Sequence, residues 1–141
     1  RLRKQKICYL LQEIGIPLGY RFGWYIRGPY SSQLTYDYFA LDEQLKEKDE
    51  PTGYTLRSNV RKKIGDAIEL FSPPNKKIPD EIWLEILASL HYLKHYAYLP
   101  ESNKTFQNLF KQLISDKPHL QDHEGVARTA WETLKQRGLV E

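Results

Sequence analysis

The amino-acid sequence predicts a mainly α-helical fold, with about six helices in one compact domain and a minor β element near residues 20–27. Three observations lead to this prediction. In most of the chain, apolar residues recur at the three- and four-residue spacing of a buried helix face. One short segment instead alternates aromatic with polar or small residues, which is the period of a strand. The chain has 141 residues, of which 40% are hydrophobic and 28% charged, as expected for a single domain with its own core.

The first helix is expected to end near Gly15, a residue type that often terminates helices. Pro17 follows shortly afterwards and prevents the helix from continuing. The buried face of this helix is expected to be the apolar stripe Ile7, Leu10, Leu11 and Ile14.

Residues 20–30 are the most distinctive segment, because five of the eleven are aromatic and two are arginine. The alternation predicts one strand over 20–27, ended by a turn at Gly28-Pro29. The inward face of the strand is expected to consist of Tyr20, Phe22, Trp24 and Ile26. Its polar face is expected to carry Arg21, Tyr25 and Arg27.

Two further helices are expected before the clearest linker, residues 72–77. The second helix begins at Ser31 or Ser32, both good N-caps, and ends before Pro51. The third spans about 57–71. The expected buried residues are Leu34, Tyr38, Leu41 and Leu45 in the second helix, and Val60, Ile64, Ile68 and Phe71 in the third. The alternative to a single domain over 1–141 is a sub-domain break near 72–78.

The fourth helix is expected to be the longest and most apolar, and therefore the central helix of the core. Pro79 lies in its first turn, where a missing N–H costs little, and Pro100 ends it. Its wide apolar stripe consists of Ile82, Trp83, Ile86, Leu87, Leu90 and Leu93.

The fifth helix is predicted over about 103–115 with Ser102 as its cap, and the sixth from near Asp122 to Gly138. The expected buried residues are Phe106, Leu109, Phe110 and Leu113, followed by Val126, Ala130, Trp131 and Leu134. This helix pair, followed by a strand at Leu139-Val140, is an alternative winged-helix-like arrangement of the C-terminal part.

Composition excludes some classes of protein. Cys8 is the single cysteine, so no intramolecular disulfide forms, which suits a reducing cytoplasm. No apolar run approaches the roughly 18 residues of a membrane span. The chain begins at Arg1 and contains no methionine, so we expect the natural chain to begin upstream.

The residues typical of enzymes do not form a recognisable pattern. His91 and His95 are four apart on one predicted helix, but two histidines do not complete a metal site, and residue 92 is Tyr92 rather than the glutamate of metalloproteases. Cys8 lies beside an apolar stripe and is expected to be packed. We therefore predict no catalytic residues, no metal, no cofactor and no enzymatic activity.

The aromatic segment is instead predicted to bind a protein partner, because Tyr, Trp and Arg dominate the energetics of protein interfaces. The competing interpretation is a core strand followed by a structural turn. The predicted partner-binding residues are Arg21, Trp24, Tyr25, Arg27, Gly28, Pro29 and Tyr30.

The net charge of +3 allows a second hypothesis, a DNA-binding transcriptional regulator. Basic residues concentrate at the N-terminus and on the third predicted helix. The candidate phosphate contacts are Arg1, Arg3, Lys4, Lys6, Arg61, Lys62 and Lys63.

The segments Lys4–Gln12 and Phe22–Ser31 resemble an uncharacterised prokaryotic family with the pattern "YLLQ…FGWYxxGPYS". They are also distantly similar to the Panacea (SocA-like) antitoxin domain over about residues 4–45. The chain departs from the Panacea pattern at Lys6-Ile7-Cys8, where leucines are usual, and at Tyr30, where the motif has valine. The resemblance implies a regulatory, antitoxin- or adaptor-like module on a mobile or defence locus, acting on a protein partner in the cytoplasm.

Overall fold

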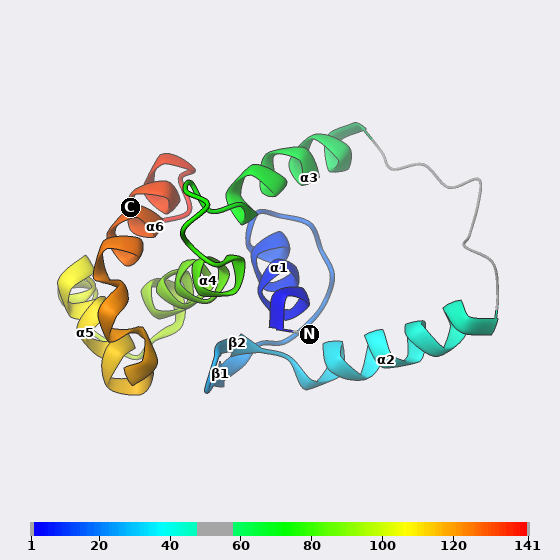
Figure 1. The fold of residues 1–141 in the computed structure, drawn as a ribbon, viewed down its shortest axis with the longest axis horizontal. Coiled ribbons are helices and arrows are strands. Elements are labelled where there is room, and N and C mark those ends of the chain that lie inside the picture. Colours follow the sequence, from blue (N-terminus) through cyan, green and yellow to red (C-terminus); the bar gives the residue numbers. More distant parts are fainter. Residues whose placement is uncertain (1, 48–57, 141) are drawn as a thin grey trace.

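The computed structural model describes residues 2–47 and 58–140, and these residues are mainly helical, as predicted. They form six α-helices and one small antiparallel sheet (Figure 1). The elements are α1 (Leu2–Glu13), β1 (Gly23–Tyr25), β2 (Gly28–Tyr30), α2 (Ser32–Glu47), α3 (Ser58–Phe71), α4 (Asp80–Tyr96), α5 (Phe106–Asp116) and α6 (Glu124–Gln136). Two short 3₁₀ turns, η1 (Glu101–Asn103) and η2 (Pro118–His123), flank α5.

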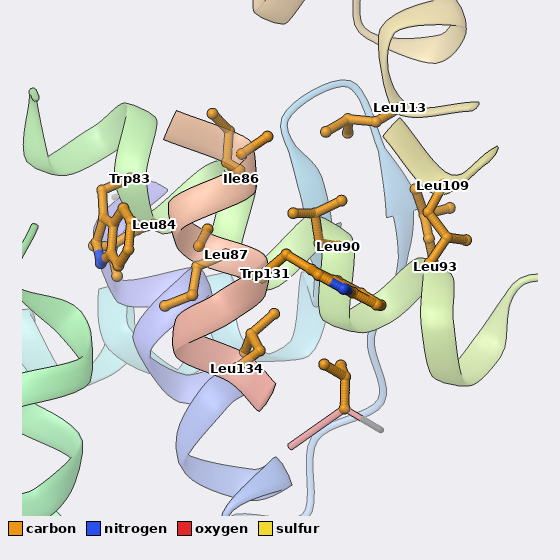
Figure 2. Packing of buried hydrophobic residues seen from close by; sticks show 14 of the residues in the cluster. Trp83, Leu84, Ile86, Leu87, Leu90, Leu93, Leu109, Leu113, Trp131 and Leu134 are labelled. Atoms are coloured by element: carbon orange, nitrogen blue, oxygen red, sulfur yellow. The ribbon is translucent and has the colours of Figure 1, made fainter. Parts of the chain in front are cut away.

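Helix α4 is the centre of the core, as its wide apolar stripe predicts. It lies between α1 on one side and α5 and α6 on the other (Figure 1). Residues 83–91 are all buried. Figure 2 shows Leu87, Leu90, Trp131 and Leu134 gathered where α4 meets α6. The buried cluster also extends to Leu70 at the end of α3.

The core continues across the linker at 72–77. Trp83, in the first turns of α4, donates its indole N–H to the carbonyl oxygen of Leu70 at 2.9 Å. This bond satisfies the one polar atom of a large buried ring. Helix α3 is therefore joined to α4 by apolar packing and by a buried hydrogen bond. On the outer side of α3, Ile68 is exposed, although its place in the apolar stripe predicted burial.

The aromatic segment is a hairpin, so the prediction of one strand over 20–27 is wrong. Strand β1 pairs with β2 in a register that places Trp24 opposite Pro29. Ile26 and Arg27 form the two-residue turn, while Gly28 and Pro29 belong to β2. Because the chain reverses at Ile26, this side chain points outward and is 81% exposed, not buried as the alternation implied.

Helix α2 extends away from the other described helices after its first turns (Figure 1). Leu34 is buried near its start, but Leu41, which was expected on the buried face, is exposed. The prediction for Leu41 fails because the stripe of α2 continues beyond the part of the helix that contacts the body. The side chain of Leu45 lies outside the described residues.

The helix boundaries in the C-terminal half differ from the predicted ones. Thr105, not Ser102, caps α5, since its side chain accepts a hydrogen bond from the backbone N–H of Asn108 at 3.3 Å. Helix α6 begins at Glu124, because Asp122 belongs to η2. In the described chain, residues 137–140 form a turn and no strand, so the exit strand of the winged-helix alternative is not formed.

We expect Leu87→Ala to lower the free energy of unfolding by about 2–5 kcal/mol, because it leaves a cavity in a fully buried site. The matched control is Ile68→Ala on the exposed side of α3, with an expected change of about 0.5 kcal/mol or less. Urea unfolding followed by circular dichroism measures both. Equal losses for the two variants would contradict the observed placement of the core.

Candidate partner-binding site

Two buried lysines that lie far apart in the sequence hold the backbone of the β1–β2 hairpin by hydrogen bonds to its carbonyl oxygens. Lys6 of α1 donates from Nζ to the carbonyl oxygen of Pro29 at 2.7 Å. Lys117, between α5 and η2, donates to the carbonyl oxygens of Tyr25 and Ile26, the latter at 2.8 Å. Lys6 is 2% exposed and Lys117 is 1% exposed. Lysine is seldom buried to this degree, so these contacts define an unusual environment.

A single buried carboxylate lies among these cations. Glu85 of α4 accepts a hydrogen bond from Nε2 of His119 at 2.8 Å and pairs more loosely with Arg27 at 3.9 Å. Burial lowers the pKa of Lys6 to about 8 from its usual 10.5, and the negative charge of Glu85 only partly opposes this shift. Burial also lowers the pKa of Lys117. At both lysines, burial therefore outweighs the effect of the nearby carboxylates on the pKa.

Gly28 fits against α4 as only glycine can. Its φ is +95°, which is strained for any residue with a side chain. A Cβ at this position would also lie 2.5 Å from Oγ of Ser89. Ser89 is fully buried, and its hydroxyl oxygen has no hydrogen-bond partner among the described residues. The hairpin and α4 are thus in backbone-to-side-chain contact at this point.

Trp24 and Tyr30 anchor the sides of the hairpin. The indole of Trp24 stacks on Tyr92 with a ring separation of 5.5 Å, and the ammonium group of Lys117 lies 4.2 Å from its centre. The hydroxyl oxygen of Tyr30 accepts a hydrogen bond from Thr35 at 2.7 Å. Both aromatic residues are half-buried. They connect the hairpin to α4 and to the start of α2.

The tip of the hairpin faces solvent. We call Tyr25, Ile26 and Arg27, together with Leu2 at the start of α1, the tip surface. Tyr25 is 53% exposed, Ile26 is 81% exposed, and Arg27 and Leu2 are also exposed. An apolar cavity of about 220 Å³ opens between these residues and Tyr30. A smaller cavity of about 120 Å³ adjoins it. We call it the polar cavity, because five of its eight lining residues, from α1, α4 and the turn, are charged, and the other three are apolar.

Apart from the half-buried anchors Trp24 and Tyr30, the predicted partner-binding residues divide into three groups in the structure. Tyr25 and Arg27 belong to the exposed tip. Gly28 and Pro29 are buried, so they shape the hairpin and their own atoms are covered. Arg21 is exposed but lines a different cavity, with Tyr20, Phe22, Tyr92 and Tyr96 among its walls.

Sequence reasoning missed most of the residues that hold the hairpin. Lys6 was assigned to an exposed phosphate-binding face, but it is 2% exposed and bonded to the hairpin, so it does not belong to an exposed basic face. The available signal for its burial was its position four residues before Leu10, which places both residues on the buried side of α1. Lys117, Glu85 and His119 gave no comparable signal, because their proximity to the hairpin exists only in the folded chain.

Other basic residues of the nucleic-acid hypothesis are exposed. Arg3 pairs with Asp80 at 3.8 Å, and Lys4 lies 5.1 Å from the ring centre of Tyr38. Residues 61–63 of α3 are exposed, with Lys63 turned toward Glu13 and Ile14 across a shared cavity, and Arg1 lies outside the described residues. DNA binding therefore stays a prediction that rests on Arg3, Lys4 and residues 61–63.

The paired histidines of α4 have structural contacts. Burial lowers the pKa of His91 to about 3, with His95 adding to the shift. Its Nδ1 is hydrogen-bonded at 2.7 Å to the hydroxyl of Tyr9, whose own pKa is raised by burial, so the hydroxyl keeps its proton. Nε2 of His95 lies 2.6 Å from the carbonyl oxygen of Leu139. Burial raises the pKa of Cys8. Within residues 2–47 and 58–140, no three metal-binding side chains cluster.

Comparison with known proteins adds no relative: no protein family matches the chain, and no curated protein or solved structure shows significant similarity to it. None of the helices in the described part is long and apolar enough to span a bilayer.

Gly28→Ala is expected to destabilise the protein by about 2–4 kcal/mol, because an alanine is strained at this φ and its methyl group meets Ser89. The control is Gly125→Ala in α6, where an added Cβ meets nothing within 4 Å, and stability should stay equal or rise slightly. Thermal unfolding of both variants provides the measurement. A neutral Gly28→Ala would show that the hairpin does not approach Ser89 as described.

The lowered pKa of Lys6 predicts a specific pH dependence of stability. Between pH 8 and 10.5, residue 6 binds more protons in the unfolded chain than in the folded one, so its contribution to stability rises with pH. The cost of the buried charge is fully present below this range. From about pH 7 to pH 9.5, the wild type should gain about 1–2 kcal/mol relative to Lys6→Met. Parallel stability curves for the two proteins in chemical denaturation at each pH would contradict this expectation.

Proposed function

We propose that this chain is a non-enzymatic protein-interaction module whose tip surface docks on a partner protein. The observation that carries the proposal is the contrast between the fixed backbone of the hairpin and the exposed side chains at its turn. Its backbone is fixed by Lys6, Lys117 and the contact at Gly28, while its turn presents Ile26 almost fully to solvent. Two-residue turns usually carry Gly, Asn, Asp or Ser, so an isoleucine there is unexpected for a structural turn.

Rigidity and composition both favour binding by this surface. A fixed hairpin loses little conformational entropy when it docks, so more of the contact energy appears as affinity. Full burial of one isoleucine side chain is worth roughly 1.5–3 kcal/mol. Tyr25 and Arg27 add residue types that are common in binding hot spots. The tip surface therefore combines an apolar anchor with neighbours that supply polar contacts.

The sequence resemblance supports a regulatory role for the module. The region that resembles the Panacea domain, about residues 4–45, includes the whole hairpin. We therefore propose an antitoxin- or adaptor-like function, in which the tip recognises another protein. The proposed setting is the cytoplasm, in keeping with the single cysteine of the chain.

The test is photo-crosslinking in the host cell, with benzoylphenylalanine in place of Ile26. The expected result is a discrete adduct with one identified protein. The control places the same amino acid at Tyr98, which is fully exposed outside the tip surface and should not give that adduct.

The identified protein is then purified and titrated with the chain by calorimetry. Ile26→Asp should weaken binding by about tenfold or more, because it puts a charge into an apolar contact, whereas Tyr98→Ala should not. Identical adducts at positions 26 and 98, or equal affinities of the two variants, would refute the docking role of the tip.

A further inference from the structure

We propose that the tip surface recognises the free C-terminus of a protein partner whose last residue has a large apolar side chain. The inference rests on the proposed function and names the chemistry that the tip would bind. It follows from two neighbouring cavities at the hairpin, one lined mainly by charged residues and the other apolar.

The polar cavity holds a buried cation without an ion-pair partner. Among the described residues, the contact of Lys6 Nζ is the carbonyl oxygen of Pro29, which uses one of its three N–H groups. A lysine that is 2% exposed normally has a carboxylate beside it. The nearest acid of the site, Glu85, already binds His119 and Arg27. An incoming anion would supply the missing partner.

The charge of the cavity favours a single carboxylate over a more highly charged group. Glu81 and Glu85 also line it, and both repel an anion. Arg3, Lys6 and Arg27 line it as well, so the cations exceed the carboxylates by one positive charge, which a single carboxylate neutralises and a doubly charged phosphate exceeds. A carboxylate matches Lys6 and the planar guanidinium group of Arg27, which is half-exposed and only loosely paired at 3.9 Å.

The apolar cavity supplies the second half of the site. Tyr25, Ile26 and Tyr30 form its walls, and its volume of about 220 Å³ gives room for one large side chain.

The adjacency of the cavities identifies a chain terminus rather than an acidic side chain. Leu2, Lys6 and Arg27 line both cavities and therefore form their common wall. In a C-terminal residue, the carboxylate and the side chain leave the same Cα, so one residue reaches both sides of this wall. An internal aspartate or glutamate would need a second residue to fill the apolar cavity. Capture of a terminal carboxylate is a known mode of peptide recognition.

The experiment uses three labelled synthetic hexapeptides and the full chain. The first ends in leucine with a free carboxylate, the second has the same sequence with a C-terminal amide, and the third has an internal glutamate before leucine and ends in an amide. Binding is followed by fluorescence polarisation and by the backbone amide signals of the ¹⁵N-labelled protein. We expect the peptide with the free carboxylate to bind at least about tenfold more tightly than either amidated peptide. It should also shift the amide signals of residues 25–28.

Two matched arginine variants test whether the peptide carboxylate binds beside Arg27. Arg27→Gln should lower the affinity for the free acid by about tenfold, whereas Arg21→Gln, in the same segment but outside both cavities, should leave it unchanged. Equal binding of the acid and the amides, preference for the internal glutamate, or no binding at millimolar peptide would each overturn the proposal. If crosslinking at position 26 still identifies a partner in that case, the docking function stands and only its terminal-carboxylate chemistry fails.

Discussion

The structure depends on two buried ammonium groups that satisfy the carbonyl oxygens of a short hairpin. Three paired residues on each strand are too few to be stable alone in water. Lys6 reaches the hairpin from α1, and Lys117 reaches it from the junction of α5 and η2. The hairpin is thereby fixed both to α1 and to the junction of α5 and η2, and its shape does not depend only on its own few hydrogen bonds.

This arrangement has an energetic cost that the rest of the fold offsets. Burying a charged lysine is unfavourable, as the lowered pKa of Lys6 shows. Charge-assisted hydrogen bonds to Pro29 and Ile26 and the shared carboxylate of Glu85 recover part of that cost. The apolar packing of α4 against α1, α5 and α6 offsets the rest of this energetic cost. Buried polar groups of this kind specify one geometry, because any displacement leaves a charge without its partner.

The helical part of the fold was predictable because each helix carries its own periodic signal. The stripe of α4 predicted its central place, and Gly15 and Gly138 marked helix ends. Residues 20–30 misled the prediction, since a two-residue turn in a hairpin reverses the chain without disturbing the alternation of aromatic residues. Tyr25 and Arg27 were identified for the candidate site from their residue types alone. Lys117, Glu85 and Ile26 could not be identified, because their role depends on contacts between residues up to 92 positions apart.

The same long separation in sequence has a consequence for the order of events in synthesis. The hairpin leaves the ribosome early, but the carbonyl oxygens of Tyr25 and Ile26 receive their donor only when Lys117 has been made and η2 has folded against it. Until then the hairpin lacks one of the two lysines that hold its backbone. A nascent or truncated chain that ends before α5 therefore carries the full aromatic segment without the hydrogen bonds that fix the turn. The tip surface takes the shape described here only once residue 117 is in place.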